Sequence, residues 1–320
     1  MRRSAWLATG LAAVFVAVGG YGVSRNPEDQ DLDAAAREAA GGQYATLSDG
    51  ITHYQVAGPA DGPPVVLVPG FSVPFYIWDS TVVSLTGAGY RVLRYDLFGR
   101  GWSDRPDVRY DNDLFDLQLA ELIEAAGFGG SVHLMGLSFG GFVAGTFAGR
   151  HPARVRSLTL VDPMTSGFDR PPWFFRLPIL GSILWQALVV PGMADGQMPD
   201  FLEPEKWPDW PDRYRTQMRY RGFGRALRSS IMVTSGVSVD SVYATVGRQS
   251  FPVQLLWGEE DQTVPIALSE GVRRAIPRIQ YHPIPRAGHL PHMERTDLVN
   301  PILLDFLHTT DSEAGTPGRP

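Results

Sequence analysis

The stretch of sequence that decides the fold is Gly136-Leu137-Ser138-Phe139-Gly140. A short apolar run at residues 131–135 precedes it and predicts a strand, and the pattern over residues 139–150 predicts a helix. A serine between two glycines at such a strand-to-helix turn forms a G-x-S-x-G elbow. The turn is sharp, so side chains at the two glycine positions would collide with neighbouring backbone. We therefore expect Ser138 to be held in a strained conformation with its hydroxyl exposed, which suits a nucleophile.

Strands and helices alternate on both sides of this elbow. The strand patterns lie at residues 44–47, 51–56, 65–68, 91–95, 131–135, 158–161, 253–257 and 279–282. The helical patterns lie at residues 113–126, 139–150, 266–275 and 291–307. This alternation favours an α/β fold with a mostly parallel central sheet and helices on both faces. Ligands of such sheets bind at the carboxyl ends of the strands, so we look for functional residues there.

Residues 163–246 interrupt the alternation. They are rich in proline and aromatic residues and contain helical patches but no strand pattern. We expect them to form a helical cap over the strand ends, inserted into a core made of residues 44–162 and 247–308. The aromatic side chains suggest an apolar tunnel for a substrate, although the internal core of the cap would explain them equally well. These side chains are Trp173, Phe174, Phe175, Trp185, Trp207, Trp210 and Tyr214.

The two ends of the chain differ from the body. An uncharged run from Ser4 to Ser24 lies between Arg3 and Arg25, and as a helix of about 1.5 Å per residue it could cross a bilayer. We therefore expect residues 1–24 to be a transmembrane anchor or a cleaved signal segment, with the catalytic domain outside the cytoplasm, either membrane-anchored or secreted. Residues 25–43 are expected to be a linker, and residues 309–320 a disordered tail.

Composition excludes several classes of protein. The 320 residues carry a net charge of −6, which argues against a nucleic-acid binder with its basic face. The absence of cysteine excludes disulfides, thiolate catalysis, iron–sulfur clusters and cysteine-based zinc sites. Lys206 is the only lysine, which leaves little for Schiff-base or P-loop chemistry. The sequence contains no metal-ligand cluster, phosphate loop or cofactor signature, so we expect neither a metal nor a cofactor.

A serine nucleophile needs a base, and His289 is the main candidate. It lies in Arg286-Ala287-Gly288-His289-Leu290, directly after the last predicted strand, where a loop returns to the carboxyl ends of the strands. His292 is the alternative, but it is better placed to begin the next helix and to make a supporting hydrogen bond.

The base in turn needs a carboxylate to orient it, and we predict that Asp261 fills this role. Asp261 follows the strand that ends at Trp257. Glu259 and Glu260 are local alternatives, and Asp162, which follows an earlier strand, is a more distant one. The order Ser, Asp, His along the chain is the order that a serine elbow of this type requires.

Two backbone amides are expected to form an oxyanion hole. One is the amide of Phe139, the residue after the nucleophile. The other is the amide of Phe71, in the loop after the strand at residues 65–68. Gly70 would let this loop approach the serine, and Pro69 cannot donate because it has no N–H.

Taken together, residues 44–307 resemble an α/β hydrolase of the capped lipase/esterase-like kind. The stretches that carry the resemblance are Val68-Pro69-Gly70-Phe71, residues 95–104 (YDLFGRGWSD), the Ser138 elbow, residues 258–265 (GEEDQTVP) and Gly288-His289. One departure is Pro69, since members usually carry histidine before this glycine. Asp96 resembles the aspartate that braces a turn in this family, so it is not counted as catalytic.

The resemblance implies a serine hydrolase that cleaves carboxylic esters through an acyl-enzyme, because relatives that open epoxides or displace halide use aspartate at the elbow. We expect an apolar small-molecule ester as substrate, of medium chain length or lipid-like, such as a monoacylglycerol. Alternatives within the fold are carbon–carbon bond hydrolases of ring-cleavage products, peptidases and cofactor-free haloperoxidases. The first of these often carry tryptophan after the catalytic histidine, where Leu290 stands here. A non-enzymatic ligand sensor or adhesion module is the alternative outside enzymes.

Overall fold

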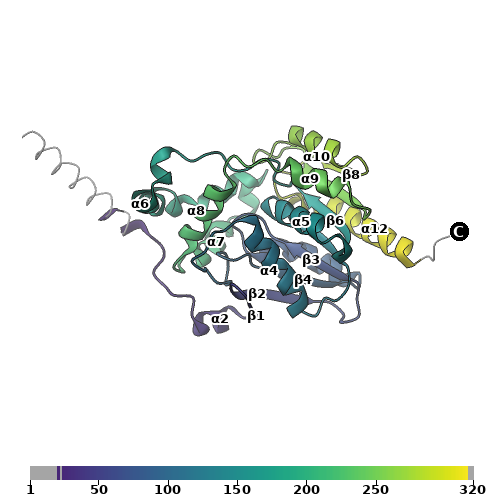
Figure 1. The fold of residues 1–320 in the computed structure, drawn as a ribbon, viewed down its shortest axis with the longest axis horizontal. Helices are drawn as coiled ribbons and strands as arrows, with labels where there is room; N and C mark the ends of the chain where they lie inside the picture. The colour runs from purple at the N-terminus through teal and green to yellow at the C-terminus, as the bar shows by residue number, and fades with distance from the viewer. Residues whose placement is uncertain (1–19, 22–23, 316–320) are drawn as a thin grey trace, which may run out of the picture.

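A computed structural model describes residues 20–21 and 24–315. In this part of the chain, eight strands form one sheet in the order β1-β2-β4-β3-β5-β6-β7-β8 (Figure 1). Neighbouring strands from β4 to β8 are parallel, and β2 alone runs antiparallel to both of its neighbours. The mostly parallel sheet predicted from the sequence is thereby confirmed. The strands are β1 Gln43–Leu47, β2 Gly50–Ala57, β3 Pro64–Val68, β4 Arg91–Tyr95, β5 Val132–Leu137, β6 Val155–Val161, β7 Val253–Gly258 and β8 Gln280–Ile284.

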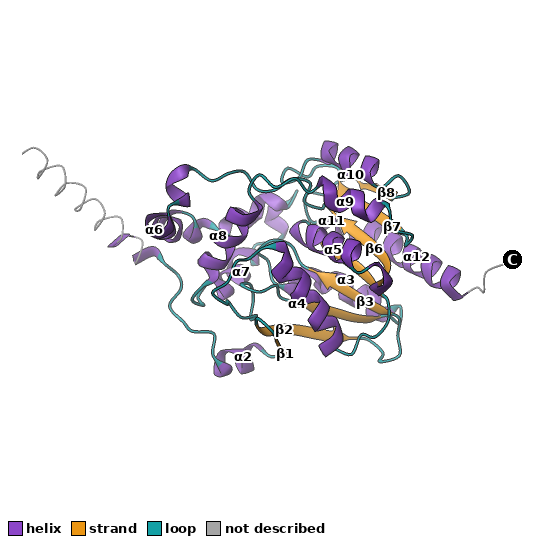
Figure 2. Cartoon of the chain, viewed as in Figure 1, coloured by secondary structure: helices purple, strands orange, loops and turns teal. Residues whose placement is uncertain are grey.

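Helices cover both faces of the sheet (Figure 2). Alternate residues of a strand point to opposite faces, so the apolar run of β3 serves two cores. Val66 and Val68 pack with α4 (Asn112–Ala125), α5 (Phe139–Arg150), α9 (Asp240–Gly247) and α10 (Ser269–Ala275). Val65 and Leu67 pack on the other side, with α3 (Asp79–Gly87) and α12 (Thr296–Gly315), which follows the short α11 (Pro291–Glu294). The continuous apolar character of the central strands follows from burial on both faces.

The insertion between β6 and β7 contains helices and no strand of the sheet. Its main helices are α6 (Pro178–Leu188), α7 (Trp210–Met218) and α8 (Phe223–Thr234), which lie together beside the sheet (Figure 1). A 3₁₀ turn at Trp173–Arg176 precedes α6, and three more lie between α6 and α7, at Val190–Gly192, Asp195–Asp200 and Pro204–Lys206. The helix α9, which the expected cap of residues 163–246 includes, packs instead against α5 and α10 on the sheet. We therefore propose that the cap ends before α9.

The segment expected to be a linker is attached to the cap. We call residues 26–41 the strap; it includes α2 (Ala34–Ala40). The Glu28 carboxylate accepts hydrogen bonds from the amides of Gly222 (2.7 Å) and Gly224 (2.8 Å), at the start of α8. The Gln30 backbone donates to the Arg219 carbonyl (2.9 Å) and its carbonyl accepts from Arg221 (2.8 Å). These hydrogen bonds hold Glu28 and Gln30 against the cap.

The C-terminal boundary also differs from expectation. The helix α12 continues through Gly315, whereas the sequence predicts a disordered tail from residue 309. Asp311 explains the extension, because its carboxylate accepts a hydrogen bond from Arg156 (2.7 Å) and lies 3.1 Å from the Nε2 atom of buried His133. This polar contact fastens the end of α12 beneath the sheet.

The prediction of a membrane location has to be corrected. Over residues 20–21 and 24–315, no helix is long and apolar enough to cross a membrane. The one described helix of sufficient length, α12, carries acidic residues at positions 297, 305, 311 and 313. The predicted anchor or signal segment, residues 1–24, lies almost entirely outside the described residues, so the membrane-anchored or secreted assignment has no support and is withdrawn.

Candidate active site

The serine elbow has the geometry that its sequence predicts. β5 ends at Leu137 and α5 begins at Phe139, and between them Ser138 has a φ of 53°, a left-handed value that is unfavourable for a residue with a side chain. A Cβ atom added to Gly136 would lie 2.3 Å from the Gly140 carbonyl oxygen. One added to Gly140 would lie 2.2 Å from the Pro69 carbonyl oxygen. The expectation that side chains would collide at both glycines is confirmed.

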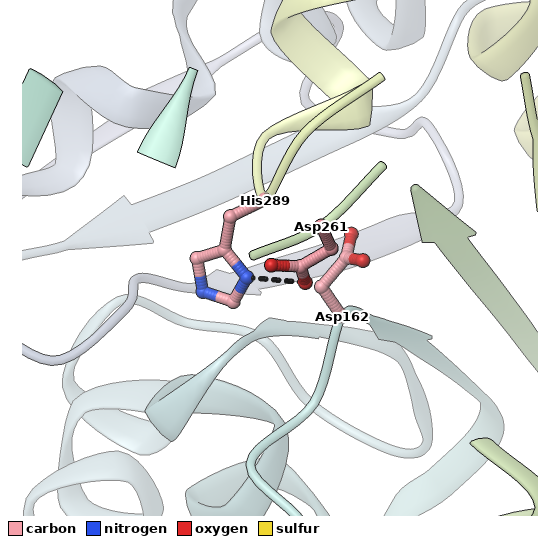
Figure 3. Close-up of side chains that lie close together, drawn as sticks. All are labelled: Asp162, Asp261 and His289. Atoms are coloured by element: carbon pink, nitrogen blue, oxygen red, sulfur yellow. Dashed lines mark hydrogen bonds and ion pairs between the residues drawn. The ribbon is translucent and has the colours of Figure 1, made fainter. Parts of the chain in front are cut away.

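The structure brings His289 and Asp261 together. The His289 Nδ1 atom lies 2.7 Å from the Asp261 Oδ2 atom, and both side chains are buried (Figure 3). The other oxygen of Asp261 accepts hydrogen bonds from the amides of Thr263 (2.8 Å) and Val264 (2.9 Å), which fix the carboxylate in the loop after β7. Ser138 and His289 line the same cavity, but no hydrogen bond joins the Ser138 hydroxyl to the imidazole in this structure.

The surroundings of His289 favour its protonated form. Burial lowers its pKa, but the hydrogen bond to Asp261 and the negative charges of Asp261, Asp200 and Glu294 outweigh burial, and the pKa is raised above its ordinary value of 6.5. An imidazole that accepts a proton readily in a water-poor site is suited to act as a general base.

Asp162, the distant alternative, lies beside Asp261 but does not bind His289. It follows β6 with a φ of 40°, and its Oδ1 atom accepts a hydrogen bond from the Gly258 amide (2.8 Å). One side-chain atom from each of Asp162, Asp261 and His289 lies within 4.8 Å of the others (Figure 3). Burial, and then the charge of Asp261, raises the pKa of Asp162 well above its ordinary value, which favours the protonated form of this carboxyl group.

A metal ion would need free oxygens in this group. The Oδ1 atom of Asp162 and both oxygens of Asp261 already interact with backbone amides or with His289. The Oδ2 atom of Asp162 is buried without a hydrogen-bond partner among the described residues, so a single carboxylate oxygen of this group is left for a further partner. The remaining alternatives lie elsewhere: Glu259 is exposed, and the carboxylate of Glu260 accepts from the Ala287 amide (3.1 Å).

His292 has the supporting role that the sequence suggests. Its Nε2 atom lies 3.0 Å from the Ile77 carbonyl oxygen, and its ring packs 4.6 Å from that of Trp78. Burial lowers its pKa to about 3, so it stays neutral and holds α11 against the segment before α3.

The amides of Phe71 and Phe139 are available as oxyanion donors. Neither N–H donates a hydrogen bond to another residue that the structure describes. The two rings pack edge to face with centroids 5.8 Å apart. A Cβ atom added to Gly70 would lie 3.8 Å from the Ser138 Cβ atom, so the loop runs directly beside the serine.

Ser138 and His289 open onto a cavity of about 390 Å³. Its apolar lining comes from Phe71, Val73, Ile77, Leu137, Phe139, Met164, Phe168, Val264, Leu268 and Leu290. The cap, predicted as residues 163–246, contributes residues 164–169 together with Gly196, Gln197 and Asp200. None of the seven aromatic residues that suggested a tunnel lines this cavity. Trp185, Trp210 and Tyr214 are buried within the cap and its contact with the core, so the internal core of the cap is the correct explanation for them.

Two acidic residues that sequence reasoning missed hold the His289 loop. The carbonyl of Asp200 accepts a hydrogen bond from the His289 amide (2.8 Å), and its carboxylate accepts from the Thr263 hydroxyl (2.5 Å). The Glu294 carboxylate accepts from the amides of Gly288 (2.7 Å) and Leu202 (2.6 Å). Both residues connect the cap to the histidine loop. Asp200 lies in no recognisable motif, and the contact depends on the path of the cap.

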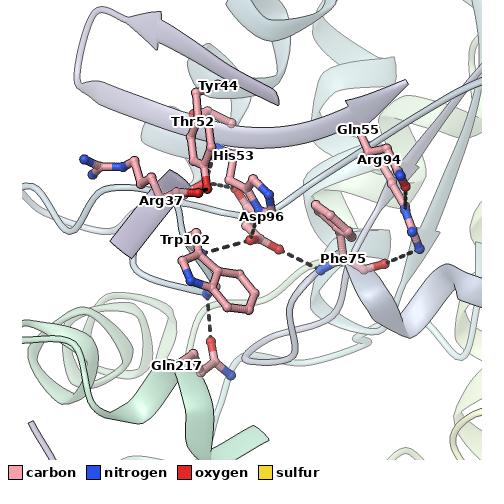
Figure 4. Close-up of polar contacts among 12 residues, drawn as sticks. Arg37, Tyr44, Thr52, His53, Gln55, Phe75, Arg94, Asp96, Trp102 and Gln217 are labelled. Atoms are coloured by element: carbon pink, nitrogen blue, oxygen red, sulfur yellow. Dashed lines mark hydrogen bonds and ion pairs between the residues drawn. The ribbon is translucent and has the colours of Figure 1, made fainter. Parts of the chain in front are cut away.

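Asp96 braces the loop after β4, as the resemblance implies (Figure 4). Its fully buried carboxylate accepts hydrogen bonds from the amides of Phe75 (2.7 Å) and Trp102 (3.0 Å), and it lies 2.7 Å from the Nδ1 atom of His53. These contacts place Asp96 in a structural network away from the catalytic cavity.

Comparison with known proteins agrees with this fold. A family model for the alpha/beta hydrolase fold matches residues 63–296, which is most of the chain. The chain therefore belongs to the α/β hydrolase family.

Individual relatives catalyse different reactions. The chain is 28% identical to a putative carbamate hydrolase, RutD, of Variovorax paradoxus over 84% of this chain and 98% of that protein. It is 27% identical to Lipase 1 of Psychrobacter immobilis over 76% of each chain. Among solved structures, the enol-lactonase of Burkholderia xenovorans LB400 superimposes with a TM-score of 0.72 at 21% identity, covering 83% of this chain and all of that one. Membership of the family therefore leaves the substrate open.

Proposed function

We propose that the protein is a serine hydrolase that cleaves carboxylic esters through an acyl-enzyme, with Ser138, Asp261 and His289 as its catalytic triad. One observation carries the proposal: the strained Ser138 elbow lines the same cavity as His289, whose imidazole is paired with the buried carboxylate of Asp261.

In the proposed mechanism His289 removes the proton from the Ser138 hydroxyl while the oxygen attacks the ester carbonyl carbon. Asp261 holds the imidazole in the tautomer that leaves Nε2 free to accept this proton, and it stabilises the imidazolium that forms. The imidazolium then protonates the departing alkoxide, and the alcohol leaves. Water, deprotonated by His289, then attacks the acyl carbonyl carbon; the bond to the Ser138 oxygen breaks, the imidazolium returns its proton to that oxygen, and the acid leaves.

The amides of Phe71 and Phe139 are proposed to bind the oxyanion of both tetrahedral intermediates. Each is a backbone donor without another partner beside the serine. Loss of one such donor typically costs about 10²–10³-fold in rate, so the pair would supply a large part of the catalysis.

The size of the cavity limits the ester. Its volume of about 390 Å³ is near the lower end of the range for ligand sites, roughly 300–1,000 Å³. A short- to medium-chain acyl group fits such a space, and the small glycerol ester of a medium-chain acid remains within it. A long acyl chain would have to extend out of the cavity.

The charges of the cavity favour neutral esters over anionic substrates. Asp169 and Asp200 are among its lining residues, and none of the lining residues is arginine or lysine. A substrate carboxylate would be repelled by these groups and would find no guanidinium or ammonium partner. Oxidative cleavage of an aromatic ring leaves a carboxylate on the product, so this observation weighs against a carbon–carbon bond hydrolase of ring-cleavage products.

A series of p-nitrophenyl esters from acetate to palmitate tests the proposal on the full chain. We expect turnover with an optimum at short or medium length, and Ser138→Ala to lose about 10⁶-fold in kcat, as serine removal does in a well-studied triad. The matched pair of p-nitrophenyl valerate and the p-nitrophenyl monoester of glutaric acid tests the charge argument. Faster turnover of the glutarate ester would contradict it, and turnover that survives Ser138→Ala would contradict the mechanism.

A further inference from the structure

Arg100 is a buried cation without an acidic partner among the described residues. It lies in the loop after β4, and only 1% of its surface is exposed. Its Nε atom donates to the Phe71 carbonyl (2.8 Å), Nη1 to the Phe98 carbonyl (2.9 Å) and Nη2 to the Ser230 hydroxyl (3.0 Å). Burial of a charge is unfavourable, so an arginine in such a place is expected to hold specific groups in position.

The groups that Arg100 holds belong to the oxyanion loop and the cap. Phe71 carries the proposed oxyanion amide, and its carbonyl is the acceptor of the shortest of the three bonds. The guanidinium carbon also lies 5.2 Å from the centre of the Phe71 ring. Ser230 is on the cap helix α8, so the guanidinium links this helix directly to Phe71.

A second side chain makes a parallel link from α7. The buried Gln217 donates from Nε2 to the Ser72 carbonyl (2.9 Å) and accepts from the Gly101 amide at Oε1 (2.8 Å; Figure 4). The carbonyls of two consecutive residues of the oxyanion loop, Phe71 and Ser72, are thus each fixed by a group that depends on a cap helix. The ring of Phe71 is fixed as well, packed 4.6 Å from that of Phe168.

We propose that Arg100 and Gln217 are positioning residues that tie the oxyanion donor Phe71 to the cap helices α7 and α8, so that the transition state is stabilised fully only when the cap is seated. The inference rests on the proposed role of the Phe71 amide. Misplacement of a preorganised donor weakens binding of the transition state more than binding of the substrate, so kcat should fall while KM changes little.

Three variants test the proposed link between Phe71 and the cap helices. Arg100→Met removes all three donors, and Gln217→Met and Ser230→Ala each remove one link from the cap. We expect kcat with p-nitrophenyl butyrate to fall about 10- to 100-fold in the first, below the loss of a whole donor, and several-fold in the other two, with little change in KM. The affinity of an alkyl boronic acid, which forms a tetrahedral adduct with the serine, should fall by the same factor as kcat. Because Arg100→Met can fail to fold, the two cap variants carry the test on their own.

Arg225→Met is the matched control, because Arg225 is also on α8 and binds Asp107 (2.9 Å) and the Arg105 carbonyl (2.6 Å) without touching the oxyanion loop. We expect its kcat and boronate affinity to equal those of the wild type even if its melting temperature falls. Cap variants that lose thermal stability but keep kcat and boronate affinity would overturn the inference. A wild-type chain that neither hydrolyses esters nor reacts with a fluorophosphonate would instead refute the proposed function.

Discussion

The replacement of each of the two neighbouring aspartates by asparagine separates their roles. In Asp261→Asn the 2.7 Å contact to His289 Nδ1 loses its negative charge, although the amide oxygen can still accept from Thr263 and Val264. The imidazole then loses the partner that fixes its tautomer and stabilises its charged form. In the serine protease template this change lowers kcat about 10⁴-fold, and we expect a loss of about 10³–10⁴-fold here.

Asp162→Asn should leave kcat/KM almost unchanged. The raised pKa of Asp162 favours its neutral form, and asparagine is neutral as well, with a side-chain oxygen that can still accept from the Gly258 amide. Asparagine also tolerates the φ of 40° at this position. We expect kcat/KM to remain within about threefold of the wild type, a change of less than 0.7 kcal/mol in the activation barrier.

The assay is kcat/KM for p-nitrophenyl butyrate on the alkaline plateau of the wild-type pH profile, with thermal unfolding of each variant to confirm that it is folded. Equal losses in the two variants, or a larger loss in Asp162→Asn, would refute the assignment of Asp261 as the carboxylate that orients His289.

Three further predictions concern the elbow and the histidines. Gly136→Ala places a Cβ atom 2.3 Å from a neighbouring carbonyl oxygen, so it should lower the free energy of unfolding, measured in urea titrations, by about 3 kcal/mol or more. Gly129→Ala is the control: its Cβ atom meets nothing within 4 Å, and it should lower the free energy of unfolding by less than about 1 kcal/mol. The raised pKa of His289 places the acidic limb of the kcat/KM profile above pH 6.5, and Asp200→Asn should move this limb to lower pH by removing a negative charge; an unmoved limb would exclude the electrostatic role of Asp200. The native pKa of His292, about 3, lies below the ordinary 6.5, so the unfolded chain binds the proton first as pH falls. The free energy of unfolding should therefore be highest above pH 6.5 and fall by up to about 5 kcal/mol towards pH 3. In urea titrations, His292→Gln should reduce this dependence on pH.

The sequence predicts those parts of the fold that depend on local pattern. A few neighbouring residues are enough to predict that the apolar runs at β3, β5 and β7 are buried strands and that the glycines around Ser138 form a sharp turn. Asp261 and His289 follow strands, and parallel strands bring their carboxyl ends to one edge, so their encounter could be expected. The helix α3 has no strong helical pattern of its own, because Val82 and Val83 disfavour a helix, and packing against the sheet stabilises it.

The missed features all depend on contacts between distant segments. Glu28 meets the start of α8 across 194 residues of sequence, and no local signal marks that pairing. Asp200 and Gln217 reach the site only through the path of the cap, and hydrophobicity cannot tell an aromatic side chain that packs inside the cap from one that lines a tunnel. The same limit applies to Arg100, whose burial is unexpected for a charged residue.

Covalent capture of the acyl group tests the central claim most directly. The full chain and its Ser138→Ala variant are mixed with p-nitrophenyl butyrate, quenched in acid during turnover, and digested for mass spectrometry. The account predicts a butyryl group on the peptide that contains Ser138 in the wild type, formed with a burst of p-nitrophenol, and no such adduct in the variant. Sustained ester hydrolysis by the Ser138→Ala variant, or an acyl group on another residue, would contradict it.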